Sequence, residues 1–168
     1  MKILFIEWES FGNEDIKDAF TKEGHRFYSF PFSNKDGRRG TEIEKELIAA
    51  LHKHTPDVVF SFNYFPVISN ACKKEDIKYI SWIYDSPYVM LYSYTVINPC
   101  NVIYIFDKEL YLEFHNAGIT TVHYLPMAAN TERLDALKPL SGRQADASSD
   151  FLYDISFVGS LYTEKHNF

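Results

Sequence analysis

Short apolar runs alternate with longer amphipathic segments from the N-terminus to Leu125. The runs are rich in β-branched and aromatic residues, and each has the length of a strand. Six strands are predicted, over residues 3–6, 26–32, 57–62, 78–84, 102–106 and 121–125. Between them, residues at helical spacing predict four helices, over residues 13–24, 41–55, 66–74 and 107–118. This order predicts one α/β domain with a Rossmann-like parallel sheet, right-handed crossovers and helices on both faces.

Local signals predict where several helices begin and end. Asn13 is predicted to cap the first helix, and Thr41 with Glu44 three residues later has the spacing of a capping box. Asp107 is predicted to cap the helix after the fifth strand. Two glycines are predicted to end helices: Gly24 and Gly118.

The chain changes character after residue 138, where the predicted domain over residues 1–138 ends. Residues 139–152 are mostly small, polar and turn-forming, which predicts a linker or hinge. Residues 153–168 begin with another strand of the buried type and continue into a glycine turn. We therefore expect residues 153–168 to open a second, truncated domain, so that the chain is part of a longer protein.

Composition narrows the class of protein. A hydrophobic share of 46% with 17% aromatic residues excludes a disordered chain. The net charge is −6 without a basic stripe, which argues against nucleic acid as the main ligand. No apolar run approaches the roughly 18 residues of a membrane-spanning helix, and the N-terminus turns acidic at Glu7 instead of forming a signal sequence. We therefore expect a cytoplasmic protein with no integral membrane segment.

Ligands of open α/β sheets bind beyond the carboxyl ends of the strands, near the point where the strand order reverses. This rule selects polar and aromatic residues that follow the predicted strands. The candidate catalytic residues are Asp85 and Glu9. The candidates for substrate binding are Ser10, Asn63, Tyr64, Ser86 and Asn130.

Asp85 is the sharpest of these features, because a carboxylate directly after an apolar strand points into the cleft and can take a proton from a sugar hydroxyl. In the alternative interpretation, Asp85 or Ser86 caps a helix whose first residue is Pro87. Glu9 is either a substrate contact or a solvated loop acid. For Asn63, holding a loop is favoured over binding a ligand.

The aromatic residues near the predicted cleft offer flat surfaces that can stack against a sugar ring. The candidates are Trp8, Tyr64, Tyr84, Tyr88, Tyr92 and Tyr94. Aromatic residues are first of all core material, so most of them are expected to be buried.

Several familiar α/β functions lack their defining residues. The loop EWESFGNED contains only Gly12 where a dinucleotide-binding fold carries three glycines, so an NAD- or FAD-dependent oxidoreductase ranks last. The third strand leads into Asn63 where a receiver domain of a two-component system carries its phosphoryl-accepting aspartate. No His, Cys, Asp or Glu set has metal-ligand spacing, and the motifs of hydrolases and P-loop proteins are missing. We therefore expect no metal and no cofactor.

Four segments resemble, in the same order, a bacterial family of uncharacterised glycosyltransferases related to spore-maturation-type proteins. The segments are SWIYDSP, LYSYTVINPCNVIYIFD, YLPMAAN and DISFVGSLYTEKHNF. The resemblance implies a glycosyltransferase B (GT-B) fold, in which two Rossmann-like domains face each other across a cleft. In that fold the first domain mainly holds the acceptor, and the second holds the nucleotide-sugar donor.

The resemblance also assigns roles to particular residues. Asp85, Ser86 and Pro87 match the family motif at the end of the fourth strand, and Gly159 and Ser160 match the turn that opens the donor domain and binds its phosphates. The implied partners are a C-terminal donor-binding domain of the same parent chain and a carbohydrate or glycosylated acceptor. If transfer inverts the anomeric centre, Asp85 or Glu9 serves as the base, whereas a retaining enzyme needs none. The 168 residues alone are expected to be inactive.

A second hypothesis needs no catalysis. In it, the chain is a Rossmann-like module that binds a glycan or a partner protein, and no donor domain follows. A buried-type strand near the C-terminus argues against a self-contained module, unless that strand pairs with a neighbouring chain.

Overall fold

The computed structural model describes residues 1–33 and 40–136. The chain divides into two units, Met1–Ala129 and Asn130–Phe168. In the second unit the structure describes one short helix, α5 (Thr131–Asp135), which begins after Asn130. The predicted linker over residues 139–152 and the predicted start of a second domain at 153–168 lie outside the described residues.

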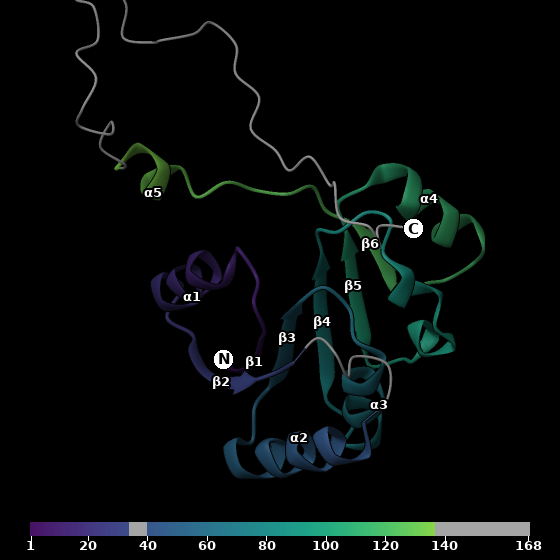
Figure 1. Ribbon diagram of the computed structural model, residues 1–168, viewed down its shortest axis with the longest axis horizontal. Helices are drawn as coiled ribbons and strands as arrows, with labels where there is room; N and C mark the ends of the chain where they lie inside the picture. The colour runs from purple at the N-terminus through teal and green to yellow at the C-terminus, as the bar shows by residue number, and fades with distance from the viewer. Residues whose placement is uncertain (34–39, 137–168) are drawn as a thin grey trace, which may run out of the picture. The chain divides into compact units, whose positions relative to one another are not determined.

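Six parallel strands form a single sheet in the first unit (Figure 1). They are β1 (Lys2–Glu7), β2 (Arg26–Pro31), β3 (Val58–Phe62), β4 (Lys78–Ile83), β5 (Asn101–Ile105) and β6 (Val122–Tyr124). The spatial order is β2-β1-β3-β4-β5-β6, so the winding direction reverses between β1 and β3. This confirms the predicted α/β fold with a Rossmann-like parallel sheet, and each predicted strand is found to within one residue at either end.

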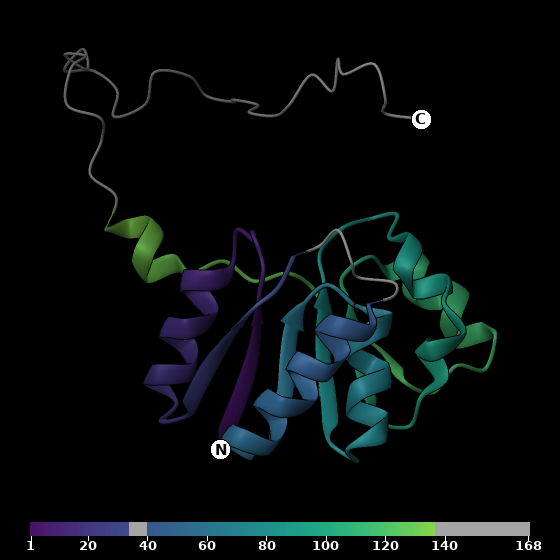
Figure 2. The same cartoon turned by 60° about the horizontal axis from the view of Figure 1, so that its bottom comes forward.

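Helices cover both faces of the sheet, as predicted (Figures 1 and 2). They are α1 (Asn13–Lys22), α2 (Thr41–His54), α3 (Pro66–Lys74) and α4 (Lys108–Asn116). Two short 3-10 helices, η2 (Val89–Tyr92) and η3 (Tyr94–Ile97), connect β4 to β5. Among the helices within residues 1–33 and 40–136, none is both long enough and apolar enough to cross a membrane.

The alternation of side chains along β1 divides the core into two clusters. Ile3 and Phe5 point to the face covered by α1, whereas Leu4 and Ile6 point to the face covered by α2, α3 and α4. On the α1 face, buried Phe20 packs edge-on against the rings of its neighbours in the sheet. All five residues of β3 are buried, because this central strand is covered on both faces.

Three of the predicted helix signals are confirmed. Asp107 caps α4 as predicted, because its Oδ1 accepts hydrogen bonds from the backbone N–H groups of Glu109 at 3.0 Å and Leu110 at 3.2 Å. Gly24 and Gly118 follow helix ends with φ angles of 70° and 82°, which confirms both predicted stops.

The other two capping predictions are wrong. The residues before α1 and α2 are glycines, and neither helix has a side-chain cap. Asn13 instead donates from Nδ2 to the carbonyl oxygen of Trp8 at 2.6 Å. Glu44 pairs with Lys74 of α3, so it does not reach back to its own helix start. Glu44 is thus engaged by a neighbouring helix, whereas Asn13 binds within the loop that leads from β1 to α1.

Gly12, the residue before α1, is required by close packing. A Cβ atom at this position would lie 2.7 Å from Cζ of Phe62, at the end of β3. The φ angle of Gly12 is −87°, which other residues adopt freely, so the constraint is space and not backbone conformation. This lone glycine therefore brings α1 close to the sheet.

Gly12→Ala is expected to lower the free energy of unfolding by about 1–3 kcal/mol, because the added methyl group overpacks the site against Phe62. Chemical denaturation of Gly12→Ala, Phe62→Leu and the double variant tests the cause. The shorter leucine leaves room for the methyl group, so Gly12→Ala should cost less in the Phe62→Leu background. Strictly additive costs would contradict the packing explanation.

Candidate functional site

Trp8 occupies the point where the strand order reverses, at the carboxyl ends of β1 and β3. Its indole Nε1 donates to the carbonyl oxygen of Phe62 at 2.8 Å. The indole stacks on Tyr84, with ring centroids 6.0 Å apart and planes 8° apart, and meets Phe65 edge-on. A dinucleotide-binding fold places a pyrophosphate over a glycine turn at this point. Here aromatic rings fill the same region.

Asn63 joins the ends of β3 and β4. It is 1% exposed and has a φ angle of 57°, a left-handed conformation that asparagine tolerates better than most residues. Its backbone N–H donates to the carbonyl oxygen of Trp82 at 2.9 Å. Its side-chain Oδ1 accepts from the backbone N–H of Tyr84 at 3.2 Å, and its Nδ2 donates to Oδ2 of Asp85 at 2.7 Å. Both ends of the amide are engaged within the protein, so Asn63 positions the loop and Asp85.

Asp85 is the exposed carboxylate at the end of β4. The hydrogen bond from Asn63 fixes Oδ2, and within the part of the chain that the structure describes no hydrogen bond to Oδ1 is found. A carboxylate held by one oxygen and accessible at the other has the geometry of a general base. The negative charge of Asp85 also contributes to raising the pKa of Tyr88, after the larger effect of burial.

Ser86 connects the end of β4 to the end of β5. Its Oγ donates to Oδ2 of Asp107 at 2.6 Å, while Oδ1 of Asp107 caps α4. The hydrogen bond from Ser86, followed by that from the backbone N–H of Leu110, lowers the pKa of Asp107. Asp107 therefore remains ionised as a structural anchor.

The prediction that Asp85 or Ser86 caps a helix starting at Pro87 is wrong. The Ser86–Pro87 peptide bond is cis, and the next element is η2, which begins at Val89 without a side-chain cap. The side chains of Asp85 and Ser86 instead bind across the sheet edge, to the loops after β3 and β5.

Glu9 and Ser10 follow Trp8 in the loop after β1. Glu9 is exposed and lines a hollow of about 860 Å³ beside the carboxyl ends of β1 and β2, together with Trp8 and Phe32. Glu7, in the same hollow, forms a 2.7 Å ion pair with Lys17, which lowers the pKa of Glu7. Ser10 lies inside the loop, where its Oγ accepts a long hydrogen bond of 3.4 Å from the backbone N–H of Gly12.

Tyr64 and Asn130 are the two remaining candidates within the described residues. Tyr64 is fully buried, and its hydroxyl donates to Oγ1 of Thr95 at 2.7 Å, so no ligand reaches it in this structure. Asn130 belongs to the second unit, where its Oδ1 accepts from the backbone N–H of Arg133 at 3.1 Å. Gly159 and Ser160 lie outside the described residues.

The structure separates the aromatic candidates by exposure. Tyr64 and Tyr88 are core residues, and Trp8 with Tyr84 is half-buried. Tyr92 and Tyr94 are exposed and line a second hollow, of about 710 Å³, between the N-termini of α2 and α3 and the two 3-10 helices. No local pattern in the sequence predicts this hollow, because its walls come from three separate segments.

Within the described ranges, no group of three or more His, Cys, Asp or Glu side chains lies close enough together to hold a metal ion. The two cysteines are free and buried, and burial raises the pKa of the Cys72 thiol. A raised pKa leaves little thiolate for metal binding or nucleophilic attack.

Comparison with known proteins adds no family. No family model matches the chain, and no curated protein matches it. A solved structure that is similar to part of this chain is that of ureidoglycine-glyoxylate aminotransferase from Bacillus subtilis, with 17% sequence identity and a TM-score of 0.36. The similarity covers 48% of this chain and 22% of that protein, and at this level it carries no argument about function.

Replacing Asn63 tests whether its amide holds this edge together. Asn63→Ala is expected to lower the free energy of unfolding by about 2–4 kcal/mol, because it removes a buried hydrogen-bonding amide and places alanine in a left-handed conformation. Asn63→Gly accepts the backbone conformation but still lacks the amide, so it should cost about 1–3 kcal/mol in the same denaturation experiment. A glycine variant as stable as the wild type would show that the amide bridge contributes nothing.

The lowered pKa of Asp107 predicts a pH dependence. The stabilisation from its ionised carboxylate is present above the ordinary aspartate pKa of about 4 and is lost as the pH falls through the lower folded-state pKa. The difference in unfolding free energy between the wild type and Asp107→Asn should therefore be constant above about pH 5 and shrink below about pH 4. A difference that does not change with pH would contradict this role.

Proposed function

We propose that Met1–Ala129 is the acceptor-side domain of a glycosyltransferase, which transfers a sugar from a nucleotide-sugar to a carbohydrate or glycosylated acceptor. The observation that carries the proposal is Asp85, an exposed carboxylate at the ligand-binding edge whose orientation is fixed by a buried asparagine. The motif SWIYDSP, which includes Asp85, and the Rossmann-like sheet agree with the first half of a GT-B enzyme.

In an inverting reaction, Oδ1 of Asp85 accepts the proton of the acceptor hydroxyl. The hydroxyl oxygen then bonds to the anomeric carbon, and the bond from that carbon to the phosphate oxygen breaks, so that a nucleoside diphosphate leaves. Asn63 keeps the carboxylate oriented by holding Oδ2, which limits the motion of the base relative to the acceptor. Asn63 is a positioning residue in this scheme.

The charges at the carboxyl edge of the sheet favour binding of the sugar acceptor over binding of the nucleotide-sugar donor. The loops after β1, β4 and β5 carry the carboxylates of Glu9, Asp85 and Asp107, which disfavour a nearby diphosphate. Phosphate binding requires backbone N–H groups or basic side chains, and the aromatic pair of Trp8 and Tyr84 fills the strand-order reversal where such a cradle would lie. By resemblance, the donor phosphates belong to the second domain, at Gly159 and Ser160.

The second candidate function is binding without catalysis. It is favoured by the exposed Tyr92 and Tyr94, which suit recognition of a ligand and require no reaction. The two candidates differ in what Asp85 does, because a binding module needs no base.

Asp85→Asn in a two-domain protein that contains this chain should lower kcat by about 100-fold or more, because asparagine preserves the shape but accepts no proton. The measurement is release of nucleoside diphosphate from UDP-, GDP- and dTDP-sugars in the presence of carbohydrate acceptors. Asp18→Asn is the matched control, because this carboxylate of α1 is exposed and forms a surface ion pair with Lys22. Undiminished turnover in Asp85→Asn would remove Asp85 from the chemistry, and no transfer by the wild type would favour the binding module.

A further inference from the structure

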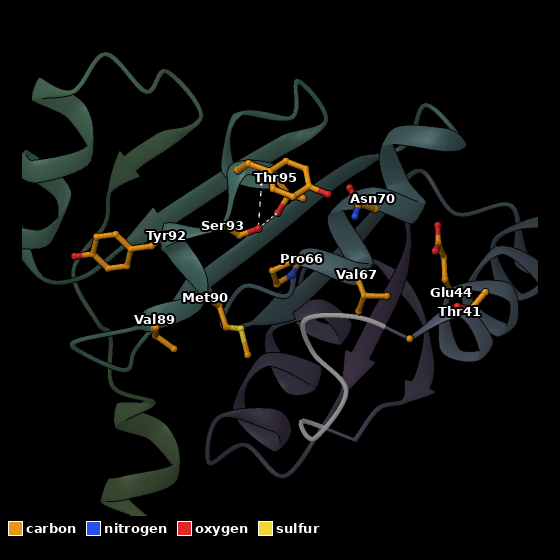
Figure 3. Close-up of a pocket in the computed structure, with 12 residues that line it drawn as sticks. Thr41, Glu44, Pro66, Val67, Asn70, Val89, Met90, Tyr92, Ser93 and Thr95 are labelled. Atoms are coloured by element: carbon orange, nitrogen blue, oxygen red, sulfur yellow. Dashed lines mark hydrogen bonds between the residues drawn. The ribbon is translucent and has the colours of Figure 1, made fainter. Parts of the chain in front are cut away.

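The hollow beside the 3-10 helices has the shape of a ligand groove. Its walls come from the start of α2 (Thr41 and Glu44), the start of α3 (Pro66, Val67 and Asn70) and the segment of the two 3-10 helices (Val89, Met90 and residues 92–95). Figure 3 shows Tyr92 and Val89 toward one end and Glu44 and Thr41 at the other, with Pro66 and Val67 between them. The volume of about 710 Å³ falls within the roughly 300–1,000 Å³ of small-molecule sites.

Two tyrosines present their rings to solvent at this groove. Tyr94 is 80% exposed and Tyr92 is 58% exposed. Tyr92 is nevertheless held in place: its hydroxyl donates to the carboxylate of Glu113 at 3.0 Å, and its ring packs on Phe114 with centroids 5.2 Å apart. These contacts anchor the segment that carries Tyr94 to α4.

A buried polar network fixes the segment that carries the tyrosines. Asn101 donates from Nδ2 to the carbonyl oxygens of Thr95 at 2.9 Å and Val96 at 3.1 Å, and its Oδ1 accepts from Ser69 of α3 at 2.8 Å. Tyr64 adds a hydrogen bond from its hydroxyl to Thr95. These buried bonds tie η3 to α3, so the groove is preformed, and little ordering entropy is lost when a ligand binds.

The chemistry of the walls favours a neutral, hydroxyl-rich ligand. The carboxylate of Glu44 is paired with Lys74, so it does not present an uncompensated charge. Asn70 and Ser93 add an amide and a hydroxyl, which are groups that exchange hydrogen bonds with sugar hydroxyls. A phosphate or a nucleic acid would instead require a positively charged surface.

We propose that this groove binds a neutral oligosaccharide, with the ring of Tyr94 stacked against a sugar face. The proposal rests on the proposed function, because it identifies the substrate class on the acceptor side of the domain. Glu44, Asn70 and Ser93 bind hydroxyl groups. The groove is distinct from Asp85 and carries recognition, while Asp85 carries proton transfer.

The test is calorimetric titration of the 168-residue chain with maltotetraose, cellotetraose and chitotetraose, each at millimolar concentration, and backbone NMR shifts locate the bound probe. At least one probe should bind and shift residues 66–70 and 89–95. Tyr94→Ala should weaken binding by about three- to tenfold, the range expected for one aromatic stacking contact. Tyr94→Trp should retain binding, because it keeps a flat ring. Phe11→Ala is the matched control, since this aromatic side chain is 97% exposed and does not line the groove.

The outcomes separate this proposal from the proposed function. If none of the three probes binds, or if Tyr94→Ala binds as tightly as the wild type, the groove proposal is overturned. If the chain binds an oligosaccharide through Tyr94 and the two-domain protein transfers no sugar, the groove proposal is supported and the glycosyltransferase proposal is rejected. If sugar transfer occurs and Tyr94→Ala leaves the KM for the acceptor unchanged, the glycosyltransferase proposal is supported and the groove proposal is rejected.

Discussion

The carboxyl edge of this sheet depends on the side chain of one buried asparagine. Asn63 follows β3 in a left-handed conformation, and its amide bonds both to the backbone of Tyr84, directly after β4, and to Asp85. Few residues combine tolerance of that backbone with a donor and an acceptor on a short side chain. A similar role falls to Ser86, whose bond to Asp107 joins the next pair of loops. The ends of three neighbouring strands are thereby linked by side chains.

The strands and most helices could be predicted from the sequence, because burial on both faces of a parallel sheet leaves continuous apolar runs with clear limits. The caps show where that reasoning stops. Asp107 also has a distant partner, Ser86, but one carboxylate oxygen caps the helix while the other accepts from Ser86, whereas Glu44 pairs with Lys74 instead of with its own helix start. The fold decides whether a side chain binds a local or a distant partner, and a local sequence pattern reveals only the local one.

The exposure of the candidate site residues could likewise be predicted only in part. The rule that ligands bind at the carboxyl ends selects Asp85, which is exposed, but it could not distinguish the buried Tyr64 from the exposed Tyr92 and Tyr94. Exposure of an aromatic ring depends on which neighbours cover it, and those of Tyr64 come from β4 and η3, which are distant in the sequence. The groove has no sequence signal for the same reason, because residues from three segments meet only in the folded chain.

The stacking of Trp8 on Tyr84 has a spectroscopic consequence. The chain contains two tryptophans, and the second is Trp82, two residues before Tyr84. The ring of Trp82 stacks on Phe62, and the carbonyl oxygen of Phe62 accepts the hydrogen bond from the indole N–H of Trp8. Both tryptophans of the protein therefore lie near the carboxyl edge. Emission from the unlabelled protein reports on this edge, so the arrival of a ligand or a second domain there becomes visible without a dye.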